Sequence, residues 1–243
     1  MLVTKADIIS RLQKDILLLQ TFKQGSVNTT VDLGIEPIEH SFPNAIFPLG
    51  AIHEFLSNAK EDAAATGGFV AGVLASLMRN DGAALWISAS RTLFPPSLRS
   101  FGIESEKIVF LDLKKDKDVL WAMEEALKCE GLTAVVGEIQ ELDFVVSRRF
   151  QIAVEQSRVT GFILRHNPRH LNITASVSRW KISSLISFLN DETPGVGFPR
   201  WNVELLKVRN GKPGAWQVEW NGKRFRHITS VVANEFELEK KTG

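Results

Sequence analysis

Short apolar segments alternate with segments of helical periodicity through the middle of the sequence, and this alternation limits the possible folds more than any other feature. Candidate strands occupy residues 52–56, 84–87, 107–111, 132–136 and 161–164, and most of them are short apolar runs. Between them, apolar residues recur three and four positions apart, as on one face of a helix. Buried strands joined by helices form a mainly parallel sheet that helices cover on both faces. The sequence therefore predicts an α/β fold.

Beyond residue 180 the pattern changes to the alternation of polar and apolar residues that is typical of half-buried strands. Three such segments, 201–208, 215–220 and 224–228, are separated by Asn210–Gly214 and by Asn221-Gly222. Asn-Gly between two strands is a strong signal of a β-hairpin. We therefore expect the domain to end in an antiparallel extension of the sheet.

The chain is expected to divide into an N-terminal helix with an irregular connection at 1–46, a core with C-terminal hairpins at 47–228, and a polar tail at 229–243. Thr4 and Asp7 are typical of a helix N-terminus, and this first helix is expected to end near Gly25. The connection that follows has room for one short strand. In the tail, Phe236 and Leu238 alternate with glutamates, so the tail is either solvated or able to add a strand to a sheet edge.

Composition favours a soluble, cytoplasmic protein. The 243 residues are enough to bury a large core without disulfides or metals, and the single cysteine, Cys129, cannot form a disulfide within the chain. No apolar run is long enough to span a bilayer. We therefore expect a reducing cytoplasmic setting and no membrane partner.

Charge is distributed unevenly, although the net charge is only +1. Residues 145–228 contain fourteen Lys or Arg and five Asp or Glu, whereas the rest of the chain contains fifteen and twenty-three. Such asymmetry indicates either a partner that carries phosphates or an acidic face, or charges that are dispersed over solvated surfaces. The sequence leaves both readings open.

The connection after the first core strand, residues 57–68, is where an open α/β sheet usually binds phosphate. A working P-loop needs glycines around the phosphates and a lysine followed by Ser or Thr. Here Ser57 and Asn58 are followed by Lys60, which comes too early, and Glu61 and Asp62 would repel a polyphosphate. We therefore expect a degenerate Walker A loop, no ATPase activity and no nucleotide cofactor.

Other catalytic or metal-binding patterns are weak or absent. Glu138 follows an apolar strand and is a weak candidate for holding Mg²⁺, but its position is off by one, and the sequence favours a solvated glutamate at a strand end. The histidines and Cys129 include no pair at metal-ligand spacing, so no metal site is expected. Gly67 and Gly68 fall inside the expected helix, where they favour close packing of helix against sheet.

Four segments carry a family resemblance. Residues 47–54 (FPLGAIHE) resemble the entry to the first core strand of RecA-type recombinases. Residues 120–129 (LWAMEEALKC), 134–138 (AVVGE) and 199–206 (PRWNVELL) are more particular, and together the segments resemble the ImuA family, the RecA-like accessory proteins of bacterial damage-induced mutagenesis. The resemblance runs from about residue 47 to residue 228. It implies a RecA-like core of the P-loop type.

The resemblance also implies partners and a process. Members of this family are associated with an ImuB-type homologue of Y-family polymerases, with an error-prone replicative-type polymerase complex and with RecA. They act in DNA repair by error-prone translesion synthesis under SOS control, so association with the nucleoid is expected during activity. Ser90 and Arg165 stand where RecA has its catalytic glutamate and its nucleotide-sensing glutamine. Both differences point to a non-hydrolysing adaptor.

Residues 207–214 resemble the K-x-R-N-G-x-x-G hairpin of RecA-superfamily helicases. In those relatives the lysine and arginine reach a neighbouring subunit's γ-phosphate, a role that suits the fixed fork of arginine. The resemblance implies that Lys207 and Arg209 face a phosphate on an ATP-bound partner. The alternative is that the segment is only a favourable turn with two solvated strand residues.

The segment after the last core strand contains Arg165, His166, Arg169 and His170. In RecA relatives a loop near this position faces DNA, and basic loop residues give salt-dependent binding without sequence preference. The segment itself has no aromatic residue that would stack on single-stranded bases. Direct contact with single-stranded DNA therefore stays an open alternative, as do a weak or active RecA-like ATPase and a cell-division regulatory module.

Overall fold

The structure is a computed structural model that describes residues 33–79, 82–89, 93–187 and 197–228. The chain divides into two units between residues 30 and 31, and all the described residues belong to the second unit. The N-terminal helix expected from Thr4, the position of Ser90 and the polar tail 229–243 lie outside the described residues. No helix in the described part of the chain is long and apolar enough to cross a membrane.

The described residues form one mixed sheet with the strand order β3-β2-β4-β5-β1-β6-β7-β8-β9. The strands are β1 (Ile52–Ser57), β2 (Ala84–Ser88), β3 (Ile108–Asp112), β4 (Ala134–Ile139), β5 (Thr160–His166), β6 (Ser178–Leu185), β7 (Arg200–Val208), β8 (Gly214–Trp220) and β9 (Phe225–His227). Neighbouring strands from β3 to β6 are parallel, and those from β6 to β9 are antiparallel. The prediction of an α/β fold with a mainly parallel sheet and an antiparallel C-terminal extension is confirmed.

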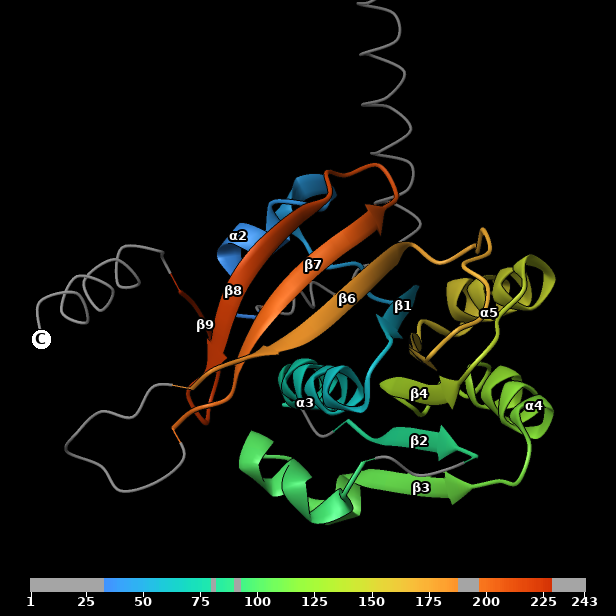
Figure 1. Ribbon diagram of the computed structural model, residues 1–243. Coiled ribbons are helices and arrows are strands. Elements are labelled where there is room, and N and C mark those ends of the chain that lie inside the picture. The colour runs from blue at the N-terminus through green and yellow to red at the C-terminus, as the bar shows by residue number, and fades with distance from the viewer. Residues whose placement is uncertain (1–32, 80–81, 90–92, 188–196, 229–243) are drawn as a thin grey trace, which may run out of the picture. The chain divides into compact units, whose positions relative to one another are not determined.

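Helices cover the parallel part of the sheet on both faces (Figure 1). The helical segments are α2 (Glu36–Glu39), η1 (Pro43–Ala45), α3 (Lys60–Leu77), η2 (Pro95–Phe101), η3 (Ser105–Lys107), α4 (Asp116–Ala126) and α5 (Phe144–Ser157). Phe55 of β1 belongs to the core shared with α3, whereas Ile52 of the same strand packs with α4 and α5. Because side chains alternate between the faces of a strand, α3 lies on one face and α4 and α5 lie on the other.

The core between α3 and the sheet is rich in aromatic rings. Phe69 of α3 lies 5.0 Å from Phe225 and 6.1 Å from Trp201, between ring centroids. Two helical glycines allow this approach: a Cβ at Gly68 would lie 3.2 Å from a ring carbon of Trp201, and one at Gly72 would lie 2.5 Å from Phe225. The expected role of a glycine in close helix–sheet packing therefore fits Gly68.

One strand was not expected. The strand β6 was not predicted, although Trp180 and Ile182 alternate with polar residues, because the change of pattern after residue 180 obscured it. In the connection that precedes β1, the described part contains the helical segments α2 and η1, and residues 26–32, where a short strand was also possible, lie outside the described residues. Leu33, Ile35 and Ile38 of this connection are buried in the same core as α3.

His53 of β1 is completely buried and neutral. Its Nε2–H donates to the carbonyl of Pro48 at 2.8 Å, so Nδ1 is the acceptor for the hydroxyl of Ser178 at 2.7 Å. The ring stacks on Phe47, with ring centroids 4.4 Å apart. Burial lowers the pKa of His53 from 6.5 to about 4, partly offset by the bond to Pro48.

This pKa shift makes the stability of the fold sensitive to mild acid. The unfolded chain takes up a proton on His53 below about pH 6.5, whereas the folded chain takes it up only near pH 4, so stability is lost as the pH falls between these values. Between about pH 7 and pH 5, we expect the free energy of unfolding to fall by roughly 2 kcal/mol on account of His53. Urea unfolding at the two pH values measures this loss.

The control is the exposed His40, which contacts only the carbonyl of Glu36. His53→Gln should remove this contribution to the pH dependence, and His40→Gln should retain it. An equal pH dependence in wild type and in His53→Gln would show that other groups cause it.

Candidate functional site

A polar cluster of Ser57, Trp86, Glu138 and His166 is contributed by four neighbouring strands, with Ser57, Glu138 and His166 at or next to the carboxyl ends of β1, β4 and β5 and Trp86 in the middle of β2. The Oγ of Ser57, the last residue of β1, lies 2.9 Å from Nδ1 of His166, the last residue of β5. The indole N–H of Trp86 donates to Glu138 at 2.6 Å, and Nε2 of His166 lies 3.6 Å from the other oxygen of Glu138. In an open α/β sheet, this is the position at which ligands bind.

Glu138 is not a solvated residue at a strand end, as its sequence context allowed. Its side chain is 4% exposed and lies inside β4, paired with Ser88 of β2 and Leu164 of β5. The carboxylate is held by the indole of Trp86 and faces His166. An acidic group therefore does stand at this end of the sheet, and protein groups already contact it.

The connection between β1 and α3 is too short to surround a phosphate. Only Asn58 and Ala59 separate Ser57 from Lys60, the first residue of the helix. Ala59 supplies no side-chain cap, and Glu61 lies in the first turn. An acidic first turn stabilises the positive end of the helix dipole and opposes the approach of an anion. Ser57 is 2% exposed, whereas Asn58, Lys60 and Glu61 are exposed.

A second polar site is centred on Glu54, in the middle of β1. Its carboxylate has no exposed surface and receives three charged or polar partners. Oε1 accepts from Arg165 at 2.8 Å, and Oε2 accepts from Arg179 at 3.0 Å and from the hydroxyl of Thr174 at 2.7 Å. Arg165 also contacts Glu141 at 3.2 Å. A buried carboxylate is stable only when it is paired and hydrogen-bonded in this way.

Residues 167–177, which we call the crossover segment, connect β5 to β6 and pass over this site. Four cations donate to its main-chain carbonyls: Arg165 to His170 (2.8 Å), Arg179 to Asn172 (2.7 Å), Lys207 to Thr174 (2.9 Å) and Arg209 to Ala175 (2.7 Å). Glu141 in turn accepts from the N–H of Arg169 at 2.6 Å. The segment is therefore fixed by side chains rather than by a helix.

Lys207 and Arg209, the two residues of the predicted phosphate-facing hairpin, are thus bound to their own chain. Burial lowers the pKa of Lys207, and the nearby charges of Arg179 and Arg209 lower it further against the opposing effect of Glu54. Among the residues that the structure describes, the four cations around the crossover segment have only the carboxylates of Glu54 and Glu141 as acidic partners. The site therefore has an excess of two positive charges.

The four residues predicted to face DNA separate into three environments. Arg165 is fully buried, so its side chain does not face a ligand, because Glu54 and Glu141 hold it inside the fold. His166 belongs to the polar cluster, with its side chain 24% exposed. Arg169 and His170 are exposed on the crossover segment.

Sequence reasoning missed Glu54, Thr174 and Arg179. A signal was present, because Glu54 interrupts an apolar run that was expected to be a buried strand. A glutamate at such a position requires a buried partner. The identity of that partner depends on the path of the crossover segment, which no local pattern reveals.

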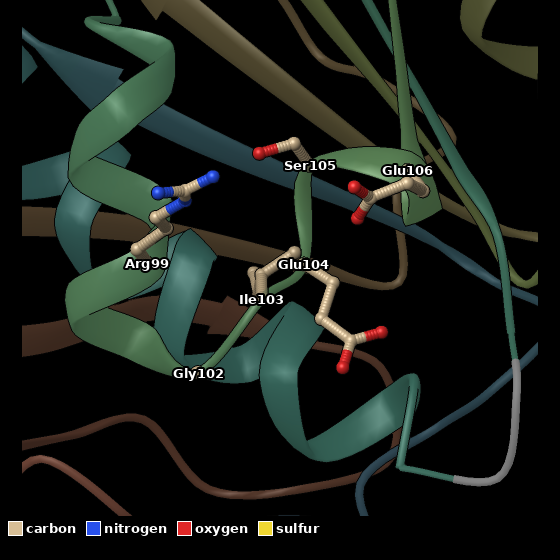
Figure 2. A pocket seen from close by; sticks show the side chains of 6 residues that line it. All are labelled: Arg99, Gly102, Ile103, Glu104, Ser105 and Glu106. Atoms are coloured by element: carbon tan, nitrogen blue, oxygen red, sulfur yellow. The ribbon is translucent and has the colours of Figure 1, made fainter.

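A surface hollow of about 340 Å³ lies between η2 and η3 (Figure 2). It is lined by Arg99, Gly102, Ile103, Glu104, Ser105 and Glu106. Figure 2 shows the guanidinium of Arg99 extending toward Ser105, and two carboxylates belong to the facing segment. These carboxylates disfavour phosphate, so the hollow does not replace the missing phosphate loop. Within the described ranges, no group of three or more His, Cys, Asp or Glu is arranged to hold a metal ion.

The fold and the polar cluster define an α/β domain of the open-sheet class in which two residues connect the first core strand to its helix. No protein-family model matches the chain. Protein ImuA of Caulobacter vibrioides strain NA1000 is 32% identical over 198 residues, which cover 76% of this chain and 81% of the relative. Protein ImuA of a second strain of Caulobacter vibrioides, CB 15, gives the same values. The chain belongs to the ImuA family.

From the buried ion pairs of Glu54 we predict how much a substitution lowers the free energy of unfolding. Glu54→Gln leaves Arg165 and Arg179 without their shared carboxylate, and we expect a loss of about 3–5 kcal/mol in the free energy of unfolding. The matched control is Glu204→Gln, which removes a partly exposed pair with Lys181 at 3.7 Å and should cost less than about 1 kcal/mol. Urea unfolding measures both. Equal losses would show that the Glu54 pairs are not special.

Proposed function

We propose that the chain is a non-hydrolysing adaptor with a RecA-like core, which acts through protein partners in DNA-damage-induced mutagenesis and error-prone translesion synthesis. Membership of the ImuA family supports involvement in this pathway. The mainly parallel sheet with its antiparallel extension fits the RecA-like core that the sequence resemblance implies. The proposed partners are RecA, an ImuB-type Y-family polymerase homologue and an error-prone replicative-type polymerase complex.

The non-hydrolysing role is supported mainly by the contacts of the residues at the carboxyl ends of the strands, where a nucleotide would bind. Ser57 and Glu138 stand where a nucleotide-binding relative needs groups for phosphate and Mg²⁺, but they contact His166 and Trp86 instead. The connection of two residues offers no backbone cradle, because a P-loop requires several glycine-containing residues at this point. These contacts support a role without ATP.

The proposed contact with a partner's phosphate is made by Lys207 and Arg209. The excess of two positive charges around the crossover segment supports it, because an anion would balance them. Arg209 is exposed, and among the described residues its side chain donates only to the carbonyl of Ala175, which leaves other guanidinium donors available. An ATP-bound RecA filament is the proposed source of the phosphate.

A second candidate function is direct binding of single-stranded DNA by the crossover segment. Arg169 and His170 are exposed there, and the nearby cations outnumber the carboxylates of Glu54 and Glu141, which favours a polyanion. Such binding would weaken steeply as the salt concentration rises.

The test of the non-hydrolysing role is a calorimetric titration of the purified protein with a non-hydrolysable ATP analogue and Mg²⁺. We expect no binding heat, because the β1–α3 connection cannot wrap the phosphates. Stoichiometric binding in the micromolar range would overturn this proposal and favour a weak or active ATPase.

The hairpin cations are tested by replacing Lys207 and Arg209 together with glutamine, which retains a donor for the carbonyls of Thr174 and Ala175 but removes the charge. We expect affinity for ATP-loaded RecA filaments to fall at least about tenfold, since charge-assisted bonds to phosphate are lost. Sedimentation with filaments measures binding.

The matched control replaces the exposed Lys212 and Lys223 with glutamine, which changes the net charge by the same amount. This control should bind normally. Equal binding by wild type and by the Lys207 and Arg209 variant would contradict the proposed contact.

A further inference from the structure

Helices α4 and α5 expose apolar side chains on the side that faces away from the sheet. Trp121 of α4 is 68% exposed, and Val145 and Ile152 of α5 are 66% and 42% exposed. The opposite side of each helix is buried in the core that the two helices share with the parallel strands (Figure 1). Solvent-facing positions of a helix are usually polar, so a tryptophan and two aliphatic residues on this layer require an explanation.

An ion pair between the two helices shows that these side chains belong to one surface. Nη2 of Arg149 in α5 lies 3.2 Å from the carboxylate of Glu124 in α4. Both helices connect parallel strands on the same face of the sheet, so they run in the same direction. Trp121 lies one turn before Glu124, whereas Val145 and Ile152 lie one turn before and one turn after Arg149. We call these three apolar residues the α4–α5 strip.

The spacing of the α4–α5 strip fits a helix. Val145 and Ile152 are seven residues apart, which separates them by about 10 Å along the axis of α5. Residues seven apart on a second helix have the same separation, so a helix that lies along α5 can contact both side chains. Tryptophan is enriched at the energetic centres of protein interfaces, which suits Trp121 as the anchor. The strip therefore fits the apolar face of an amphipathic helix.

Cations beside the strip determine the charge of its partner. Lys117 and Arg148 are exposed, and each lies one turn from a side chain of the strip. Within the described ranges of the chain, neither cation forms an ion pair. Glu124 and Glu125, by contrast, already pair with cations, and Glu155 lies toward the C-terminal end of α5. A partner helix with acidic residues beside its apolar face therefore complements this surface.

We infer that the α4–α5 strip binds an amphipathic helix of a partner protein, which places apolar residues against the strip and acidic residues against Lys117 and Arg148. This inference rests on the proposed function, because it assigns a surface to one of the proposed protein partners. That partner is the ImuB-type polymerase homologue. The contact proposed for RecA is with a phosphate at the hairpin 207–214, whereas the strip is apolar and suits a protein helix.

Binding of the full chain to the purified ImuB-type homologue, measured by calorimetry, tests the strip. We expect Trp121→Ser/Val145→Ser to weaken this association at least about tenfold, because a buried tryptophan often dominates an interface. The matched control is Phe94→Ser/Ile186→Ser, which replaces an exposed aromatic and an exposed aliphatic residue outside α4 and α5 and should bind normally. All four positions are exposed, so both variants should fold, and urea unfolding checks this.

Charge reversal tests the acidic character of the partner helix. Lys117→Glu/Arg148→Glu places two carboxylates where the acidic residues of the partner are expected, so it should weaken the association. The control Lys212→Glu/Lys223→Glu changes the net charge by the same amount at exposed positions outside α4 and α5, and its effect should be smaller. Equal effects of the two variants would contradict an acidic partner at the strip.

The other outcomes separate a failure of this inference from a failure of the proposed function. If wild type and Trp121→Ser/Val145→Ser bind the homologue equally well, the strip is not the docking surface, although the proposed partner stands. If wild type does not bind the homologue, both the inference and that partner are wrong. If sedimentation velocity shows a dimer for wild type and a monomer for the variant, a second copy of the chain covers the strip. Binding to RecA filaments should be the same in wild type and the variant, and its loss would make RecA the occupant.

Discussion

The buried carboxylate of Glu54 is the interaction on which the arrangement of the described domain depends most. It joins β1 to Arg165 of β5, to Arg179 of β6 and to Thr174 of the crossover segment. The idealised cost of burying one carboxylate is far larger than the whole stability of a domain, so Glu54 is tolerated only because all its partners are present. Two guanidiniums and a hydroxyl satisfy both oxygens, which fixes the position of three strands and one loop together.

The network around Glu54 also holds the crossover segment in place without a helix. A parallel connection usually contains a helix that satisfies its own main chain. Here the connection from β5 to β6 is irregular within the described residues. Its main-chain carbonyls instead receive hydrogen bonds from Arg and Lys side chains of the sheet strands and the residue that follows one of them. Leu171 and Ile173 of the segment are exposed to solvent.

The sequence was sufficient for the fold class and for most strands, because buried strands and amphipathic helices have strong local patterns. It was insufficient for β6, whose short alternation of Trp180 and Ile182 follows an irregular segment. Glu138 and Arg165 were misread as exposed for a related reason. Their burial comes from Trp86, Glu54 and Glu141, residues distant in the sequence, so no local pattern could show it.

The polar cluster near the carboxyl ends of the strands and the crossover segment differ in their balance of cations and carboxylates. Near the carboxyl ends of the strands, Glu138 accepts from the indole of Trp86, and Nε2 of His166 lies 3.6 Å from its other oxygen. At the crossover segment, cations outnumber carboxylates, and the surplus is held against carbonyls, which carry only partial charge. Lysine has three donors and arginine has five, so a bond to one carbonyl does not exhaust either group. Holding the segment and contacting an anion are therefore compatible roles for Lys207 and Arg209, and an anionic partner would balance the surplus charge.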